Sequence, residues 1–182
     1  MKQPFLGAAI AAMIAISGVA NAQYSGSTSV NARPSGVTFR GGIILPVDSN
    51  LRDVSTTFIG IGMEYSLTHT YLNSGETFVS VDWFGKSGSG AHGNVFPVCI
   101  NQRFYTGTKT NRYGSGRTYF FVGAGVTFID VTEATNQIGA RGGIGMELGP
   151  SIVVEAAGYL SGKARDGVSA DAVGLYVGYR FP

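Results

Sequence analysis

The sequence predicts an all-β fold, an eight-stranded antiparallel up-and-down transmembrane β-barrel, on three observations. Eight short segments alternate between apolar residues and a second set of small, aromatic or charged residues, and a period of two is typical of β-strands. All the charges in the cores of these segments belong to that second set. The 182-residue chain is also apolar on average, with a mean hydropathy of +0.16 and 13% charged residues.

The N-terminus has the features of an export signal. Met1 and Lys2 give a positive start, residues 5–16 form a short apolar run, and Ala20-Asn21-Ala22 has the small-x-small pattern of a cleavage site. No later stretch approaches the roughly 20 apolar residues of a transmembrane helix. We therefore expect a signal peptide in residues 1–22, a flexible lead in residues 23–35 and one barrel domain in residues 36–182.

The alternating segments have about the 9–11 residues that a tilted strand needs to cross a bilayer. In chain order, the expected strands are Gly36–Pro46, Thr56–Leu67, Glu76–Phe84, Val95–Tyr105, Thr118–Phe128, Gln137–Leu148, Ile152–Ser161 and Asp171–Phe181. Turn-forming residues separate them: Asn73–Gly75 precedes the third strand, Ser87–Gly90 the fourth, Gly114–Gly116 the fifth, Gly149-Pro150 the seventh, and Gly162 follows the seventh. The last strand alternates most regularly, with Val173, Leu175, Val177, Tyr179 and Phe181 on its apolar side.

Alternation alone also fits a soluble, lipocalin-like barrel with its apolar residues inside. Three features favour the membrane form. The polar side is rich in glycine, which suits a narrow lumen better than a solvated face. Lys86, Lys109 and Lys163 all lie in connectors. Aromatic residues of the apolar side lie near strand ends, where lipid-interface girdles form: Phe39, Tyr65, Trp83, Phe104, Phe120, Phe128, Tyr179 and Phe181. Gln102 is the one polar residue on the lipid side of its strand.

The architecture and the closing sequence, Gly174 to Phe181, resemble the OmpA/OmpX-type eight-stranded barrels of the Gram-negative outer membrane. The resemblance implies a cell outer-membrane location, termini on the periplasmic side, and recognition of the last strand by the barrel-assembly machinery. Here Pro182 follows the terminal aromatic residue, whereas such chains typically end on the aromatic itself.

With the termini on the periplasmic side, the inward charges can be sorted by depth. Three arginines and three glutamates fall near the periplasmic end: Arg40, Arg103, Arg180, Glu64, Glu147 and Glu155. Arg40 is expected between Glu64 and Arg180 on its two neighbouring strands, while Asp82 and Arg141 lie nearer the outer end and meet across the lumen. Buried charges are costly unless paired, so we predict an ionic network that blocks the lumen.

Inward aromatic residues are expected to pack over the glycines and fill the rest of the lumen: Phe58, Phe84, Tyr105, Tyr119, Phe121, Tyr159 and Tyr176. Eight strands close around side chains and leave no room for a wide porin channel. The sequence therefore favours a non-enzymatic role in envelope structure or surface interaction. A narrow pore for small solutes or apolar molecules stays open as the alternative.

Some small outer-membrane barrels modify lipid A with a histidine, a serine and an acid at the outer rim, so an enzyme is a third hypothesis. His92 lies in an outward loop with two serines nearby, and His69 lies in a turn on the periplasmic side, but neither belongs to a recognisable catalytic motif. We predict no catalytic residues, no metal site and no cofactor. The net charge of +2 argues against a nucleic-acid partner, and the single cysteine, Cys99, excludes an internal disulfide.

The expected partners are outer-membrane lipid and the assembly machinery, with the chain as a monomer. The sequences of the four outward loops do not identify a surface partner. These loops are short and polar: Val47–Ser55, Gly85–Asn94, Ile129–Asn136 and Gly162–Ala170.

Overall fold

The computed structural model describes residues 36–67, 75–86, 92–106, 117–131, 133–149, 151–164 and 167–181. The expected signal peptide and lead lie outside the described residues, as do His69, Lys109 and Pro182. No helix in the described part of the chain is long and apolar enough to cross a membrane.

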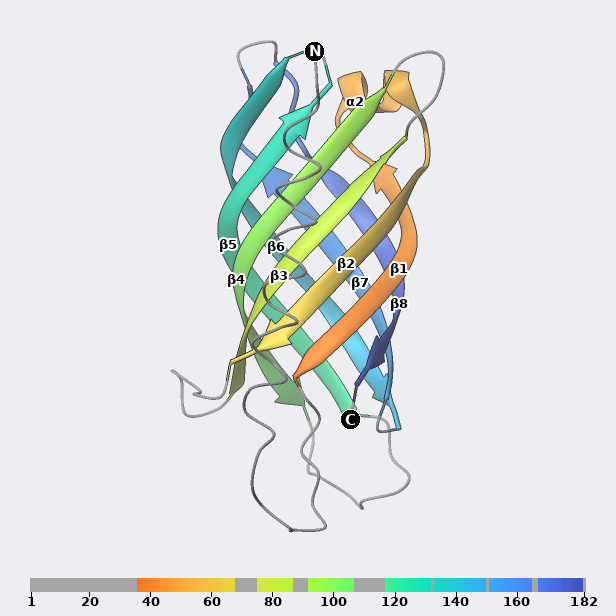
Figure 1. The fold of residues 1–182 in the computed structure, drawn as a ribbon, viewed down its shortest axis with the longest axis vertical. Coiled ribbons are helices and arrows are strands. Elements are labelled where there is room, and N and C mark those ends of the chain that lie inside the picture. Colours follow the sequence, from red (N-terminus) through yellow and green to blue (C-terminus); the bar gives the residue numbers. More distant parts are fainter. Residues whose placement is uncertain are drawn as a thin grey trace.

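Eight antiparallel strands close into a barrel in which each strand pairs with its neighbours in the sequence and β1 pairs with β8 (Figure 1). The elements are β1 (Val37–Pro46), α2 (Ser49–Val54), β2 (Phe58–Ser66), β3 (Gly75–Lys86), β4 (Gly93–Thr106), β5 (Arg117–Asp130), β6 (Ala134–Leu148), β7 (Ile152–Ser161) and β8 (Ala172–Arg180). This confirms the fold class and all eight expected strands, whose ends differ from the expected ones by three residues at most. Below, the upper end is the one that carries α2, and the lower end is where β1 begins and β8 ends (Figure 1).

The two faces of the wall differ as the alternation predicts. In β8, Val173, Leu175 and Val177 face outward and are about half exposed or more, whereas Tyr176 is buried in the lumen. The outward Gln102 of β4 lies opposite Thr77 of β3 and accepts a hydrogen bond of 2.7 Å from its hydroxyl group. This polar pair satisfies part of its own hydrogen-bonding needs on an otherwise apolar surface.

A short helix covers part of the upper mouth of the barrel, where the sequence indicated only a polar loop. The Asp48 carboxylate caps α2 by accepting hydrogen bonds from the backbone N–H groups of Asn50 and Leu51, at 2.9 and 3.2 Å. Its other oxygen accepts a hydrogen bond from the hydroxyl group of Ser169, at 3.1 Å. The capped helix thereby directs Leu51 into the barrel, where the side chain is fully buried.

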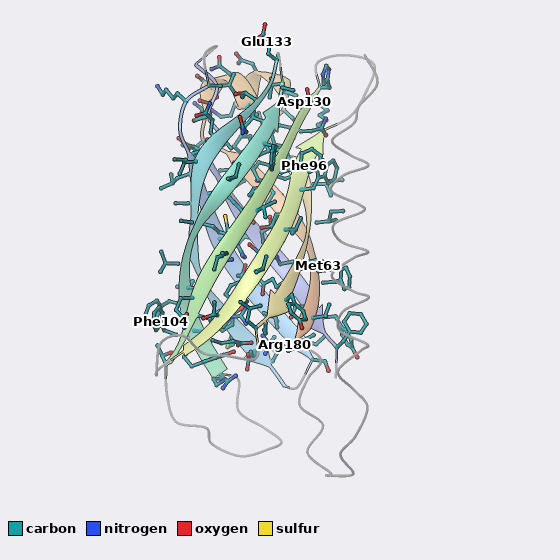
Figure 2. All side chains as sticks on the ribbon, turned by 60° about the vertical axis from the view of Figure 1, so that its left-hand side comes forward. Met63, Phe96, Phe104, Asp130, Glu133 and Arg180 are labelled. Atoms are coloured by element: carbon teal, nitrogen blue, oxygen red, sulfur yellow. The ribbon has the colours of Figure 1, made fainter. Side chains whose placement is uncertain are left out.

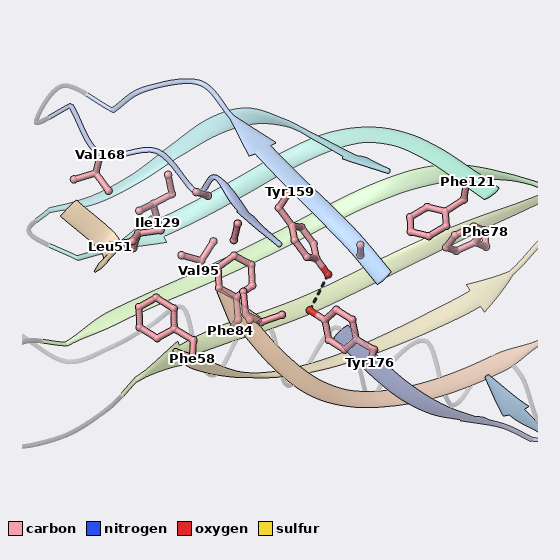
Figure 3. Close-up of a cluster of buried hydrophobic side chains, with 14 of the residues drawn as sticks. Leu51, Phe58, Phe78, Phe84, Val95, Phe121, Ile129, Tyr159, Val168 and Tyr176 are labelled. Carbon is pink, nitrogen blue, oxygen red and sulfur yellow. Dashed lines mark hydrogen bonds between the residues drawn. The ribbon is translucent and has the colours of Figure 1, made fainter. Parts of the chain in front are cut away.

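An apolar layer fills the upper part of the lumen. Leu51 and Val168 enter it from the two segments at the upper end, and strand residues complete it: Ile44, Phe58, Phe84, Val95 and Ile129 (Figure 3). All seven are at most 3% exposed. Figure 3 shows Phe78 and Phe121 farther along the barrel, with Tyr159 and Tyr176 between the two groups. The lumen is therefore packed with the chain's own side chains at this end.

We predict that Leu51→Ala lowers the free energy of unfolding by about 2–5 kcal/mol, because it leaves a cavity in the apolar layer. Arg52, the next residue of α2, is exposed, so Arg52→Ala should change the stability by no more than about 0.5 kcal/mol. Urea unfolding in lipid vesicles, followed by the fluorescence of the single tryptophan, measures both variants. Equal stabilities for the two would show that α2 does not contribute to the packing.

Candidate functional site: the charged lumen

The centre of the lumen holds four charged side chains of alternating sign. Arg40 of β1 and Arg141 of β6 each contact both Glu64 of β2 and Glu155 of β7, with Nη–Oε distances of 2.9 and 3.1 Å to Glu64. None of these side chains is more than 3% exposed. Because β2 and β6 are four strands apart in a closed barrel of eight, the contact between Arg141 and Glu64 joins opposite walls.

Asp82 of β3 extends this set on the upper side. Its carboxylate accepts a hydrogen bond from Nη2 of Arg40 at 2.6 Å and lies 3.8 Å from Nε of Arg141. The Tyr159 hydroxyl group lies 3.2 Å from Oδ2 of Asp82 and 2.8 Å from the Tyr176 hydroxyl group (Figure 3). A chain of hydrogen bonds thus links the charged centre to the underside of the apolar layer.

A second group of charges lies at the lower rim. Arg103 joins it to the centre, because its guanidinium group lies 2.6 Å from Oε2 of Glu64 and 3.3 Å from Oε2 of Glu76. Glu147 accepts hydrogen bonds from Arg117 at 3.0 Å and from Arg180 at 2.6 Å. The Tyr105 hydroxyl group lies between the two rim carboxylates, 2.6 Å from Glu76 and 3.0 Å from Glu147. The rim side chains are partly exposed, up to 26% for Arg117.

The whole assembly, which we call the ionic cluster, contains five arginines and five carboxylates: Arg40, Arg103, Arg117, Arg141, Arg180, Glu64, Glu76, Asp82, Glu147 and Glu155. Its formal charges cancel. Aromatic rings cover the guanidinium faces that no carboxylate reaches. Arg103 lies between Phe78 and Tyr119, at 4.3 and 4.5 Å from the ring centroids, and Arg141 lies 4.5 Å from that of Phe121. These contacts suit a planar, weakly hydrated cation in a narrow space.

The structure brings all eight charges named from the sequence into the ionic cluster, but with different neighbours. The residue opposite both Glu64 and Arg180 is Thr38, whereas Arg40 lies opposite Gly62 and Gly178. The expected contact of Arg40 with Glu64 is present, at 2.9 Å. It runs diagonally between the strands, because the stagger places Arg40 two residues away from the position opposite Glu64 and Arg180.

Asp82 and Arg141 meet across the lumen as expected, with 3.8 Å between Oδ2 of Asp82 and Nε of Arg141, and both also contact members of the central group. Glu76 and Arg117 belong to the cluster but were not named from the sequence. Both residues lie near the end of a strand, at positions that the alternating pattern assigns to the inward side, so the pattern could have identified them.

Glycines make room for these long side chains. A Cβ atom at Gly62 would overlap a carboxylate oxygen of Asp82 and lie 2.8 Å from Nε of Arg40. A Cβ atom at Gly145 would overlap the Tyr119 ring. The glycines of the inward face thus determine where the charged and aromatic groups can cross the lumen.

The eight aromatic residues named from the sequence as a lipid interface lie on the outward side of their strands. At the lower end, Phe181 packs edge-on against Phe39 and Tyr179, at centroid distances of 5.7 and 5.1 Å, and Phe104 stacks on Phe120 at 5.0 Å. Figure 2 shows Phe104 on the outside of the lower end. The others are Tyr65, Trp83 and Phe128, which are half-buried. The Trp83 indole N–H donates to Asn94 at 3.1 Å.

The described residues contain no group of three histidine, cysteine or acidic side chains that could hold a metal ion. His92 is exposed, and it makes no hydrogen bond or ion pair with any residue that the structure describes. Ser87 and Ser89 of the same loop lie outside the described part. The described ion pairs brace the barrel across its lumen.

A search of solved structures found similar barrels. The outer membrane enzyme PagL matches with a TM-score of 0.56 and 11% identity over 79% of this chain and 99% of the PagL chain. The chain has the fold of the small eight-stranded outer-membrane β-barrels. At this identity the likeness is one of fold.

Two further structures match with lower scores. The N-terminal β-barrel domain of Pseudomonas aeruginosa OprF has a TM-score of 0.47 and 12% identity, over 82% of this chain and all of that one. Ail, the attachment invasion locus protein of Yersinia pestis, has a TM-score of 0.48 and 15% identity, over 80% of this chain and 97% of that one. A scan against protein-family models and a search of curated proteins each found no match.

We predict that Gly62→Ala lowers the free energy of unfolding by about 3 kcal/mol, because the new methyl group displaces Asp82 from Arg40. Gly41→Ala is the matched control. Gly41 is on the neighbouring strand but faces outward, and a Cβ atom there would lie 3.9 Å from the nearest atom, so its effect should stay within about 0.5 kcal/mol. Urea titration in vesicles compares the two. A Gly62→Ala protein as stable as the Gly41→Ala protein would contradict the cluster geometry.

Proposed function

We propose that this protein is an exported outer-membrane β-barrel with a non-enzymatic role in envelope structure and surface interaction, and that the ionic cluster and the apolar layer close its lumen. In this proposal the lower end faces the periplasm and the upper end faces outward. The signal peptide is cleaved, and the mature chain is a monomer in lipid that the barrel-assembly machinery inserts through β8.

The observation that carries the proposal is the apolar belt on the outer surface of the barrel. Large aliphatic side chains are exposed on seven of its eight strands, among them Ile59, Ile100, Ile138, Ile144, Leu160 and Leu175. Ile138 is 81% exposed. Water-soluble proteins rarely expose continuous apolar surfaces of this extent, whereas a lipid-facing barrel requires one. The charges meanwhile lie inside, which is the reverse of a soluble carrier.

The lumen supports a structural role over transport. Contacts between opposite walls cross it at the ionic cluster, and seven buried apolar side chains fill it above. The surface available to a partner is the upper rim, where Figure 2 places Asp130 and Glu133. The exposed or half-exposed charges there also include Asp48, Arg52, Asp53, Lys86 and Lys163. The PagL likeness concerns the fold, so it does not by itself favour an enzyme.

We expect the protein to fractionate with outer membranes and to migrate differently in SDS gels before and after boiling, because paired strands without free edges resist detergent until heated. The measurement is sucrose-gradient fractionation of cells that express the full chain, followed by gels of boiled and unboiled samples. A soluble protein without a mobility shift would contradict the proposal and favour a lipocalin-like carrier.

Conductance distinguishes the closed barrel from a narrow pore. In planar bilayers we expect no stepwise currents from the wild type, from Arg40→Ala or from Phe84→Ala, because each single change leaves the other closure in place. The double variant should conduct in steps. Arg117→Ala with Phe84→Ala is the matched control and should stay silent, since Arg117 lies at the partly exposed rim.

Steps from the wild type would instead support the pore. Steps from Arg40→Ala alone would show that the ionic cluster is the sole closure. Boiled and unboiled gel samples establish that each variant has folded.

A further inference from the structure

Several buried polar atoms of the lumen have no hydrogen-bond partner among the residues that the structure describes, although they belong to the ionic cluster or to its neighbour Asn101. They are Nε of Arg40, Nε of Arg103, Nε and Nη1 of Arg141, Nη2 of Arg180, and Oδ1 of Asn101. Arg141 and Asn101 are each only 1% exposed. Burying such a group without a partner is unfavourable, so the set points to a bound group that satisfies it.

The chemistry of the set identifies the ligand. Five of the six atoms are guanidinium N–H donors, which cannot accept a hydrogen bond, and one is an amide oxygen, which cannot donate. An anion would satisfy the donors, but it would be repelled by the amide oxygen of Asn101 and would add a net negative charge to a cluster whose charges cancel. A cation would be repelled by the guanidinium donors. Water has both donor and acceptor sites, and buried water typically makes about three hydrogen bonds to groups of this kind.

The orientation of Asn101 is fixed by its own hydrogen bonds. Its Nδ2 donates to Oγ of Ser80 at 3.0 Å and to the backbone carbonyl oxygen of Cys99 at 3.1 Å. Because a carbonyl oxygen can only accept, the amide nitrogen must face these groups and Oδ1 must face the other way. A Cβ atom at Gly123 would overlap that oxygen, so Oδ1 lies directly over a residue that has no side chain.

The same glycine lies opposite Arg141 on its other side. Gly123 pairs with Asn101 of β4 and with Arg141 of β6. The unpartnered amide oxygen and the unpartnered guanidinium nitrogens therefore come from the two strands that flank a glycine. The next row of inward residues is also small, and it runs over four strands through Ser80, Cys99, Gly125 and Gly139.

The polar groups farther up have partners. Tyr159 and Tyr176 bond to each other, Tyr159 also bonds to Asp82, and Ser169 donates to Asp48. Above them stand the apolar side chains of Phe58, Phe84, Val95 and Ile129, which would not hold water. At the lower end the cluster reaches the partly exposed rim, where Glu76 is 24% exposed. The lower end is therefore the end at which polar, partly exposed groups continue into the lumen.

We propose that the lower half of the lumen is a hydrated inlet, with ordered water bound between Asn101 and Arg141 over Gly123. It opens at the lower rim, extends to the row of small residues at Cys99 and stops beneath the apolar layer. The inference needs the barrel geometry but not the membrane location. If the proposed function holds, the ionic cluster exchanges water with the periplasm alone.

The single cysteine of the chain makes the inlet measurable. In protein reconstituted in lipid and transferred to D₂O, infrared spectroscopy follows conversion of the Cys99 S–H group to S–D. The matched control combines Cys99→Ala with Val95→Cys. This moves the thiol four residues along β4, past Pro97, and keeps it on the inward side of the strand. Val95 is 1% exposed and Cys99 is 2% exposed, so the two sites are equally buried.

We expect the thiol at position 99 to exchange faster than the thiol at position 95 by on the order of tenfold or more, because exchange in a dry core awaits a local opening. Equally slow exchange would overturn the inlet, and equally fast exchange would overturn its closed upper end. Asn101→Leu, checked for folding by gel mobility, should slow exchange at Cys99. An unchanged rate in that variant would show that Asn101 does not hold the water.

Discussion

Every charge that faces inward in a barrel of eight strands must find its counter-charge within the same narrow lumen. Side chains fill the lumen of such a barrel and exclude bulk water. An unpaired arginine there would have no solvent to stabilise its charge. In this chain five arginines meet five carboxylates, and six of the ten ion pairs between the described residues join strands that are not neighbours. The charge balance therefore does more than satisfy single residues, because it ties the walls of the barrel to one another.

Most of the wall is held by the hydrogen bonds of neighbouring strands, which fix the register but not the cross-section of the barrel. The side chains that cross the lumen fix the cross-section. Arg141 reaches Glu64 on the opposite wall, and Tyr159 of β7 reaches Asp82 on the opposite strand β3. These long groups fit because glycine occupies the positions beside them, as at Gly62. Glycine in these strands is thus a packing requirement and not a weakness of the sheet.

Much of this fold could be predicted from the sequence. An apolar outer surface and a filled lumen require apolar and inward-facing residues to alternate strictly along each strand. The eight strands and the inward side of the charges in their cores follow from that pattern alone. The residues that lie directly opposite one another do not follow, since the stagger places Gly62 and not Glu64 opposite Arg40. Arg40 still reaches Glu64 diagonally, at 2.9 Å.

The short helix α2 was not predicted from the sequence, for a different reason. It has only six residues, too few for a helical period. Its apolar residues, Leu51 and Val54, pack against side chains that come together only once the mouth of the barrel is formed. Arg117 lies one residue outside the strand that the pattern indicated, so its inward direction could be seen only with the strand extended.

The two closures of the lumen differ in kind, and their order along one axis matters more than the strength of either. An ion or a water molecule that passes the ionic cluster next meets Phe84, Val95 and Ile129, where it would lose its hydration without gaining a partner. An apolar molecule that enters between these side chains from above next meets Arg40, Asp82 and their paired charges, which it can neither solvate nor displace cheaply. Each barrier rejects what the other would tolerate. Two modest barriers of opposite chemistry in series therefore exclude a wider range of solutes than one large barrier of either kind, which is the arrangement expected of a barrel that holds a membrane without making it leak.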